Sequence, residues 1–128
     1  MIQNKEKIHS FTDLVAWKDS HKLAIMIYEA TKSFPKEEIF GLTNQIRRAS
    51  VSVVSNIAED FSRSSAKEKI QFYSVSLGSL TEVQSQLFIA RDIQYINKEG
   101  FDRILEQTIT VSKLCNGLIK KSRSTIIP

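Results

Sequence analysis

Residues 65–92 read SAKEKIQFYSVSLGSLTEVQSQLFIARD. Ser65 followed by Glu68 three residues later is the pattern of a capping box, which opens a helix. Apolar side chains then recur every three or four residues, the period of a helix face and not of a strand. They are Ile70, Tyr73, Leu77, Leu80, Val83, Leu87 and Ile89 or Ala90. This stretch therefore predicts one long helix.

Three further stretches show the same period. Thr12 or Asp13 can cap the first helix, and Pro35 ends it because the residue before a proline avoids helical geometry. Asn97 can cap the last helix. The four helices are expected over about 13–33, 41–61, 66–92 and 98–121. Short connections make neighbours antiparallel, so the sequence predicts an all-α, antiparallel up-down-up-down four-helix bundle.

The composition is that of one globular domain. The chain has 128 residues with 41% hydrophobic and 25% charged side chains, four glycines and two prolines, values close to globular averages. We expect a flexible polar lead, the bundle and a short tail, over residues 1–10, 11–122 and 123–128. No apolar run approaches the roughly 20 residues that a membrane helix needs, and no apolar signal core is present. A membrane location is therefore not expected.

The positive charge is concentrated near the C-terminus. The formal net charge is +4, and all fourteen acidic residues precede residue 113, where an equal number of Lys and Arg side chains balances them. The excess lies on Lys113, Lys120, Lys121 and Arg123. A basic tail on a neutral bundle attracts phosphates modestly. Solubility, or compensation of the helix dipole at a C-terminus, explains the same residues nearly as well.

A polar band follows the second helix beside its apolar face. Its side chains are mostly short hydroxyls and amides, which suit a surface that another helix or subunit partly covers. A ligand or nucleic-acid role is the alternative. Gly78 in the third helix predicts close approach of another helix, since an interior glycine costs about 1 kcal/mol against alanine. The candidate helix or subunit contacts are Gln45, Ser52, Asn56, Glu59, Gly78 and Glu82.

Arg47 and Arg48 are adjacent and project about 100° apart around their helix. They therefore cannot both face the same partner. One of them is expected to pair with Glu82 or with an acidic group of a neighbouring subunit. A guanidinium that meets a carboxylate also fits a phosphate, so the alternative of phosphate binding stays open.

No set of residues has the pattern of an active site. His21 has no second histidine, cysteine or paired carboxylate near it in sequence. The adjacent Glu59 and Asp60 diverge, which argues against a pair that shares a proton, and a solvated helix end is expected for both. Cys115 lies on an apolar stripe and is interpreted as a small core residue. It has no disulfide or zinc partner, which favours a reducing, cytoplasmic setting. We therefore expect no catalytic residue, no metal and no other cofactor, hence no enzyme.

Two adjacent motifs carry a family resemblance. Residues 40–52 read FGLTNQIRRASVS, and residues 55–59 read SNIAE. Together they resemble the signature of the four-helix-bundle family of ribosomal RNA intervening-sequence proteins. So do FTDL at 11–14 with Trp17, and GSL at 78–80. The chain departs from the family where Asp60 and Ser62 replace frequent glycines and Val54 replaces a frequent proline.

The resemblance implies a protein encoded within an intervening sequence of a large-subunit ribosomal RNA gene. Such proteins are loosely called ribosomal proteins, and they are related to the accessory protein of diversity-generating retroelements. That relative partners a reverse transcriptase and nucleic acid. Members of the family tend to form ring-shaped homopentamers. The implied partners are therefore further copies of the chain, ribosomal or other structured RNA, and a protein similar to a reverse transcriptase.

These observations combine into one hypothesis and one rival. The first is a non-enzymatic, self-assembling bundle that contacts RNA or an RNA-handling protein through basic side chains. The rival is a protein-protein interaction adaptor without a nucleic-acid role, which salt-dependent RNA binding would distinguish. The candidate nucleic-acid-binding residues are Arg47, Arg48, Arg63, Lys67, Lys69, Lys120, Lys121 and Arg123.

Overall fold

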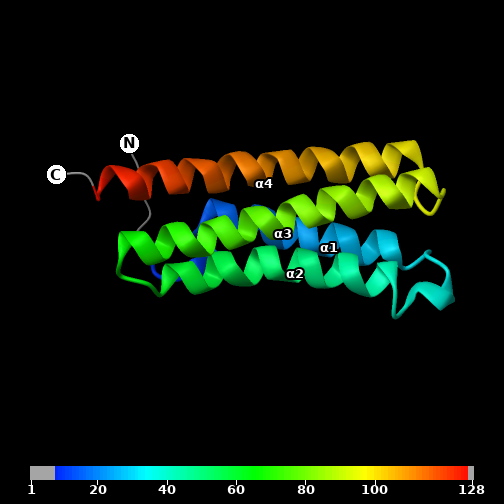
Figure 1. The fold of residues 1–128 in the computed structure, drawn as a ribbon, viewed down its shortest axis with the longest axis horizontal. Helices are drawn as coiled ribbons and strands as arrows, with labels where there is room; N and C mark the ends of the chain where they lie inside the picture. The colour runs from blue at the N-terminus through cyan, green and yellow to red at the C-terminus, as the bar shows by residue number, and fades with distance from the viewer. Residues whose placement is uncertain (1–7, 127–128) are drawn as a thin grey trace.

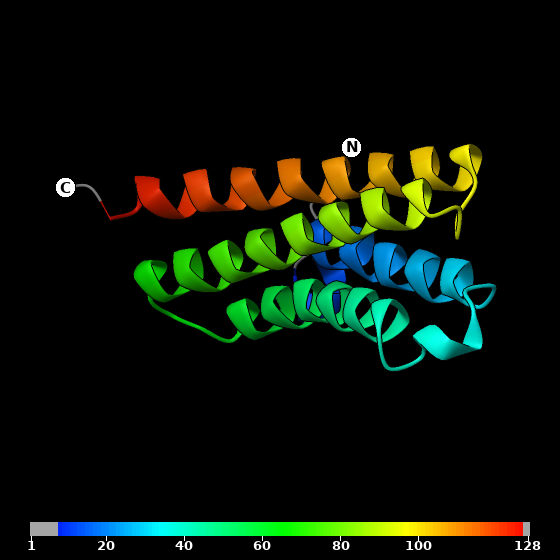
Figure 2. The same ribbon diagram turned by 45° about the vertical axis from the view of Figure 1, so that its right-hand side comes forward.

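The computed structural model describes residues 8–126. Residues 1–7 of the predicted lead and residues 127–128 of the predicted tail lie outside the described residues. Four long helices run side by side, each antiparallel to the next (Figures 1 and 2). They are α1 (Val15–Thr31), α2 (Leu42–Phe61), α3 (Ala66–Asp92) and α4 (Lys98–Ser124), with short 3-10 helices η1 (Phe11–Asp13) and η2 (Lys36–Glu38). The prediction of an all-α four-helix bundle is confirmed.

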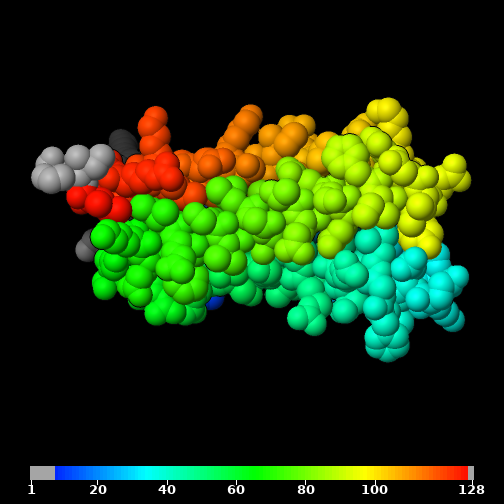
Figure 3. Space-filling model, in the orientation of Figure 1, coloured from blue at the N-terminus to red at the C-terminus, as the bar shows by residue number. Residues whose placement is uncertain are grey.

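The packing order follows the chain order. α1 contacts α2, α2 contacts α3, α3 contacts α4, and α4 closes the bundle against α1. The rod-like surface in Figure 3 presents α2, α3 and α4 side by side. Among residues 8–126, no helix is long and apolar enough to cross a membrane.

The first and last helices differ from their predicted bounds. α1 begins at Val15, after the predicted Asp13, because Ser10 caps the separate turn η1 and Leu14 is extended with φ −72° and ψ 131°. It also ends two residues earlier than predicted, at Thr31. α4 continues to Ser124, into the segment predicted as a tail, with Lys121 and Arg123 in its last turn. Cations there complement the negative end of the helix dipole, which favours the extension.

Each helix contributes to one continuous core. The fully buried side chains include Leu23 of α1, Ile57 of α2, Leu80 of α3 and Ile104 of α4. Removing such side chains from water is the dominant favourable term in folding. Cys115 belongs to the same cluster, as predicted.

The loops at one end of the bundle are joined by Glu38. One of its carboxylate oxygens accepts a hydrogen bond from the backbone N–H of Leu42 at 3.0 Å, and so caps α2. The other accepts from the Tyr95 hydroxyl at 2.9 Å, in the connection between α3 and α4. These bonds, the backbone one first, lower the pKa of Glu38. The loop before α2 is thereby fixed to the loop before α4.

Candidate nucleic-acid interface

Six of the eight predicted nucleic-acid-binding residues lie at one end of the bundle. The antiparallel order brings the end of α2, the start of α3 and the end of α4 together there (Figure 1). We call this region the basic end. It comprises Arg63, Lys67, Lys69, Lys120, Lys121 and Arg123.

Most of these cations have no ionic partner. Arg63 pairs with Glu59, four residues earlier, and its guanidinium lies 4.8 Å from the centroid of the Phe72 ring. The other members of the basic end form no ion pair with any described residue. Lys67, Lys120, Lys121 and Arg123 are exposed, and Lys69 is half-buried. This end of the bundle therefore presents several positive charges to solvent that form no ion pair with a described carboxylate.

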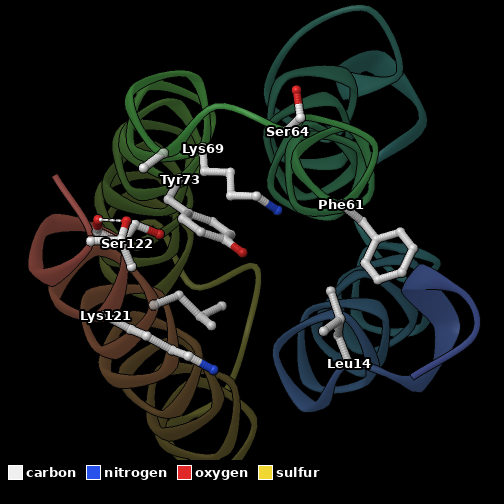
Figure 4. A pocket seen from close by; sticks show the side chains of 10 residues that line it. Leu14, Phe61, Ser64, Lys69, Tyr73, Lys121 and Ser122 are labelled. Carbon is white, nitrogen blue, oxygen red and sulfur yellow. Dashed lines mark hydrogen bonds between the residues drawn. The ribbon is translucent and has the colours of Figure 1, made fainter. Parts of the chain in front are cut away.

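A hollow of about 400 Å³ opens within the basic end. Figure 4 shows that the side chains of Lys69 and Tyr73 point from α3 into the space between the helices, and that Lys121 extends from α4. The rest of the wall is formed by Leu14, Phe61, Ser64, Ala66, Leu118, Ser122 and Thr125. The wall thus combines lysines, hydroxyl groups and the first residue of α3. Backbone N–H groups at a helix N-terminus and nearby cations both favour anions.

Asp60 is buried beside this hollow, in contrast to the solvated helix end expected for it. Its side chain is 0% exposed, and neither carboxylate oxygen has a hydrogen-bond partner of good geometry among the described residues. Burial raises the pKa of Asp60, and the nearby Tyr73 hydroxyl and Lys69 ammonium oppose that shift. The position of Asp60 along the helix explains its burial. Asp60 follows the buried Val53 and Ile57 at helical spacing, so it lies on the inward face of α2.

Replacement of Asp60 by asparagine is expected to raise the free energy of unfolding at neutral pH. The folded carboxyl has a pKa above its ordinary value of 3.8, whereas the unfolded chain keeps that value. The wild type therefore loses stability as the pH rises from about 4 through the raised pKa, and the loss persists above it. Urea unfolding at about pH 4 and pH 7 measures the difference. The gain should shrink at the lower pH.

The exposed Glu106→Gln change on α4 is the control. Glu106 forms no ion pair with a described residue, so its replacement should not give a pH-dependent gain. An Asp60→Asn gain of equal size at both pH values would contradict the raised pKa.

Arg47 and Arg48 lie apart from the basic end, in the first half of α2. The Nε of Arg47 donates to the Thr31 hydroxyl at 2.8 Å, and its guanidinium lies 4.7 Å from the centroid of the Tyr28 ring. Arg47 therefore joins α2 to α1. Arg48 is exposed. The expected pairing with Glu82 is wrong within the chain, since no ion pair among the described residues includes either arginine.

A polar hollow of about 490 Å³ lies on the surface between α2 and α3, and Arg48 is one of its lining residues. It brings together the predicted contact residues Gln45, Ser52 and Glu82. The Ser52 and Ser79 hydroxyls lie 2.8 Å apart and join the two helices. Asn56 donates from Nδ2 to the backbone oxygen of Ser52 at 2.8 Å. These contacts place Gln45, Ser52 and Asn56 of the polar band at the junction of α2 and α3.

The other two predicted contact residues lie elsewhere. Glu59 is at the basic end, where it pairs with Arg63. Gly78 is exposed, and a Cβ added to it would meet no described atom within 4 Å. The close approach of another helix expected at Gly78 is therefore wrong within the chain. A contact with a second subunit stays a prediction for Gly78.

The remaining titratable residues do not converge. His21 is exposed and stacks on Trp17 with 4.8 Å between the ring centroids. Burial raises the pKa of the Cys115 thiol to about 11, which keeps the group protonated. The described residues contain no cluster of three or more histidine, cysteine or acidic side chains that would hold a metal ion.

The sequence matches the family model described as 23S rRNA-intervening sequence protein over residues 12–117. A similar fold occurs in a crystal structure of a protein with unknown function from the S23 ribosomal protein family of Bacteroides thetaiotaomicron. The TM-score is 0.77 and the identity 24%, over 83% of this chain and 99% of that one. At this identity the likeness shows the fold alone. No protein of curated function matches the sequence.

The family match covers the four helices from α1 to most of α4. It includes both motifs that carried the resemblance, residues 40–52 and 55–59. The chain therefore belongs to the family of 23S rRNA-intervening sequence proteins.

Proposed function

We propose that this protein is a non-enzymatic, self-assembling RNA-binding bundle that holds structured RNA against its basic end. The observation that carries the proposal is the gathering of Arg63, Lys67, Lys69, Lys120, Lys121 and Arg123 at one end of the rod. Phosphate contacts by such cations release counterions and supply most of the sequence-independent affinity for nucleic acid. The description of the family as 23S rRNA-intervening sequence proteins supports RNA as the nucleic acid.

Self-assembly strengthens this proposal. A single basic end offers few phosphate contacts and binds RNA weakly at physiological salt. Several copies in a closed ring, with a pentamer as the expected form, repeat the basic end around one axis. Binding at one end then raises the effective concentration of the RNA at the others. The affinity of the assembly for RNA should therefore exceed the affinity of a single basic end.

The salt dependence of RNA binding tests the proposal. The affinity of the purified protein for a short RNA stem-loop is measured between about 50 and 200 mM KCl. Each phosphate contact contributes about 0.7 to 0.9 to the slope of log affinity against log salt. Four exposed cations form no ion pair with a described residue: Lys67, Lys120, Lys121 and Arg123. They should therefore give a slope of roughly −3 per bound chain.

The rival function, a protein-protein adaptor, predicts no RNA binding at any salt concentration in this experiment. The polar hollow between α2 and α3 favours that rival. It combines Arg48 and Glu82 with the buried Oε1 atom of Gln86, which has no hydrogen-bond partner among residues 8–126. A protein partner, such as one similar to a reverse transcriptase, can complete these contacts. Absence of RNA binding at the lowest salt would reject the RNA proposal and leave the adaptor.

A further inference from the structure

An aromatic side chain projects from the end of the bundle opposite the basic end. Phe40 is 92% exposed and lies between η2 and α2. Its loop is held in place, since the Gly41 N–H donates to the Glu38 backbone oxygen at 2.9 Å and the Glu38 carboxylate binds Leu42 and Tyr95. Ile39 beside it is also exposed. The fold thus keeps a large apolar side chain in water on a fixed support, and burial of this side chain against another surface would be favourable.

An apolar groove of about 340 Å³ lies elsewhere on the same molecule, between α1 and α2. Ile25, Tyr28 and Val51 line it and are themselves exposed. The remaining lining residues are His21, Ala24, Val54 and Ser55, so the groove contains no acidic side chain, lysine or arginine. A cavity of about 150 Å³ already accepts benzene, so the groove has room for a phenylalanine ring. The stacking of Arg47 on Tyr28 fixes one wall.

Phe40 cannot fill the groove of its own chain. Val51 lies nine residues into α2, which places it about 14 Å along the helix from the loop that carries Phe40. A helix of this length is rigid, and the loop is tied to Tyr95. Phe40 can therefore enter this groove only on another copy of the chain.

We propose that Phe40 of one copy inserts into the groove between α1 and α2 of a second copy. This inference rests on the self-assembly in the proposed function and names its contact. A projection and a hollow at different places on one surface make a heterologous contact, which generates a closed ring when the rotation between copies closes. Every copy in such a ring uses one Phe40 and one groove. All basic ends then lie on the same side of the ring.

Two single changes remove the contact from either side. Phe40→Ala deletes the projecting ring, and Val51→Glu places a charge in the groove at an exposed helix position. Both variants should have the mass of a single chain, 14.6 kDa, by light scattering at a concentration where the wild type is oligomeric. Val75→Glu is the matched control, because Val75 is an equally exposed valine on α3 outside the groove. It should keep the wild-type mass.

A mixing experiment identifies the contact itself. Phe40→Ala chains retain the groove and Val51→Glu chains retain Phe40, so an equimolar mixture forms one intact contact and should give a dimer. Circular dichroism checks that each variant is helical. A Phe40→Ala variant with wild-type mass would overturn the inference and leave self-assembly standing. A wild type that is itself monomeric would overturn both, while RNA binding is judged separately by its salt slope.

Discussion

Charge reversal at the basic end should weaken RNA binding about a hundredfold in a variant that carries both Lys67→Glu and Lys121→Glu. Both lysines are exposed and form no ion pair with a described residue, so the bundle should keep its fold. A charge-assisted hydrogen bond to phosphate is worth about 1.5 kcal/mol, or about tenfold in affinity, for each lysine. The slope of log affinity against log salt should also become shallower by about two.

The control variant makes the same change in net charge at the opposite end. Lys36→Glu lies in η2 and Arg103→Glu near the start of α4, and both residues are exposed. Filter binding or fluorescence anisotropy with one RNA stem-loop compares the two double variants. If the control loses as much affinity as the basic-end variant, net charge attracts RNA and the basic end is not the contact.

Truncation of a core side chain on α4 should cost a large part of the stability. Ile104 is 0% exposed and packs in the common core of the four helices. Ile104→Ala is therefore expected to lower the free energy of unfolding by about 2 to 5 kcal/mol. A domain of this size has only about 5 to 15 kcal/mol in total. Urea denaturation at low protein concentration measures the loss.

Ile109→Ala on the same helix is the matched control. Ile109 is 37% exposed, and exposed substitutions usually change stability by about 0.5 kcal/mol or less. Losses of similar size for the two variants would mean that the face of α4 turned toward the core is assigned incorrectly.

The fold could be predicted from the sequence because each helix carries a long and regular signal. The bounds of α3 match the predicted 66–92, since the Ser65 hydroxyl accepts a hydrogen bond from the Glu68 backbone N–H and so caps the helix. The first residue of α1 could not be predicted in the same way. Ser10, Thr12 and Asp13 are all good capping residues, and the sequence does not say which of them precedes the long helix. The structure uses Ser10 for η1 and starts α1 after Leu14.

The basic end was predictable in part. Two groups of cations far apart in sequence, within residues 63–69 and 120–123, meet because the helices alternate in direction, which the short connections require. The position of Arg47 was not predictable, because its partners Thr31 and Tyr28 belong to α1. The relative rotation of two packed helices decides that contact. The periodicity of apolar residues along one helix does not determine this rotation.

Two positions differ from their expected environments, and the helical spacing explains both. Gly78 lies opposite the face formed by Tyr73, Leu80 and Val83, so periodicity already places it outside the core. Asp60 continues the buried face of α2. It was expected at a solvated helix end because carboxylates are rarely buried without a partner. The residue type of Asp60 therefore predicts exposure, whereas the structure buries this side chain near Lys69.

Photochemical crosslinking can locate RNA on the surface of the bundle. A stem-loop RNA is crosslinked to the wild-type protein at low salt, and the attached peptides are identified by mass spectrometry. If RNA lies against the basic end, crosslinks are expected within residues 62–73 and 118–125, the segments that form the basic end and its hollow. Crosslinks confined to the opposite end, around η2 and the start of α4, would contradict it.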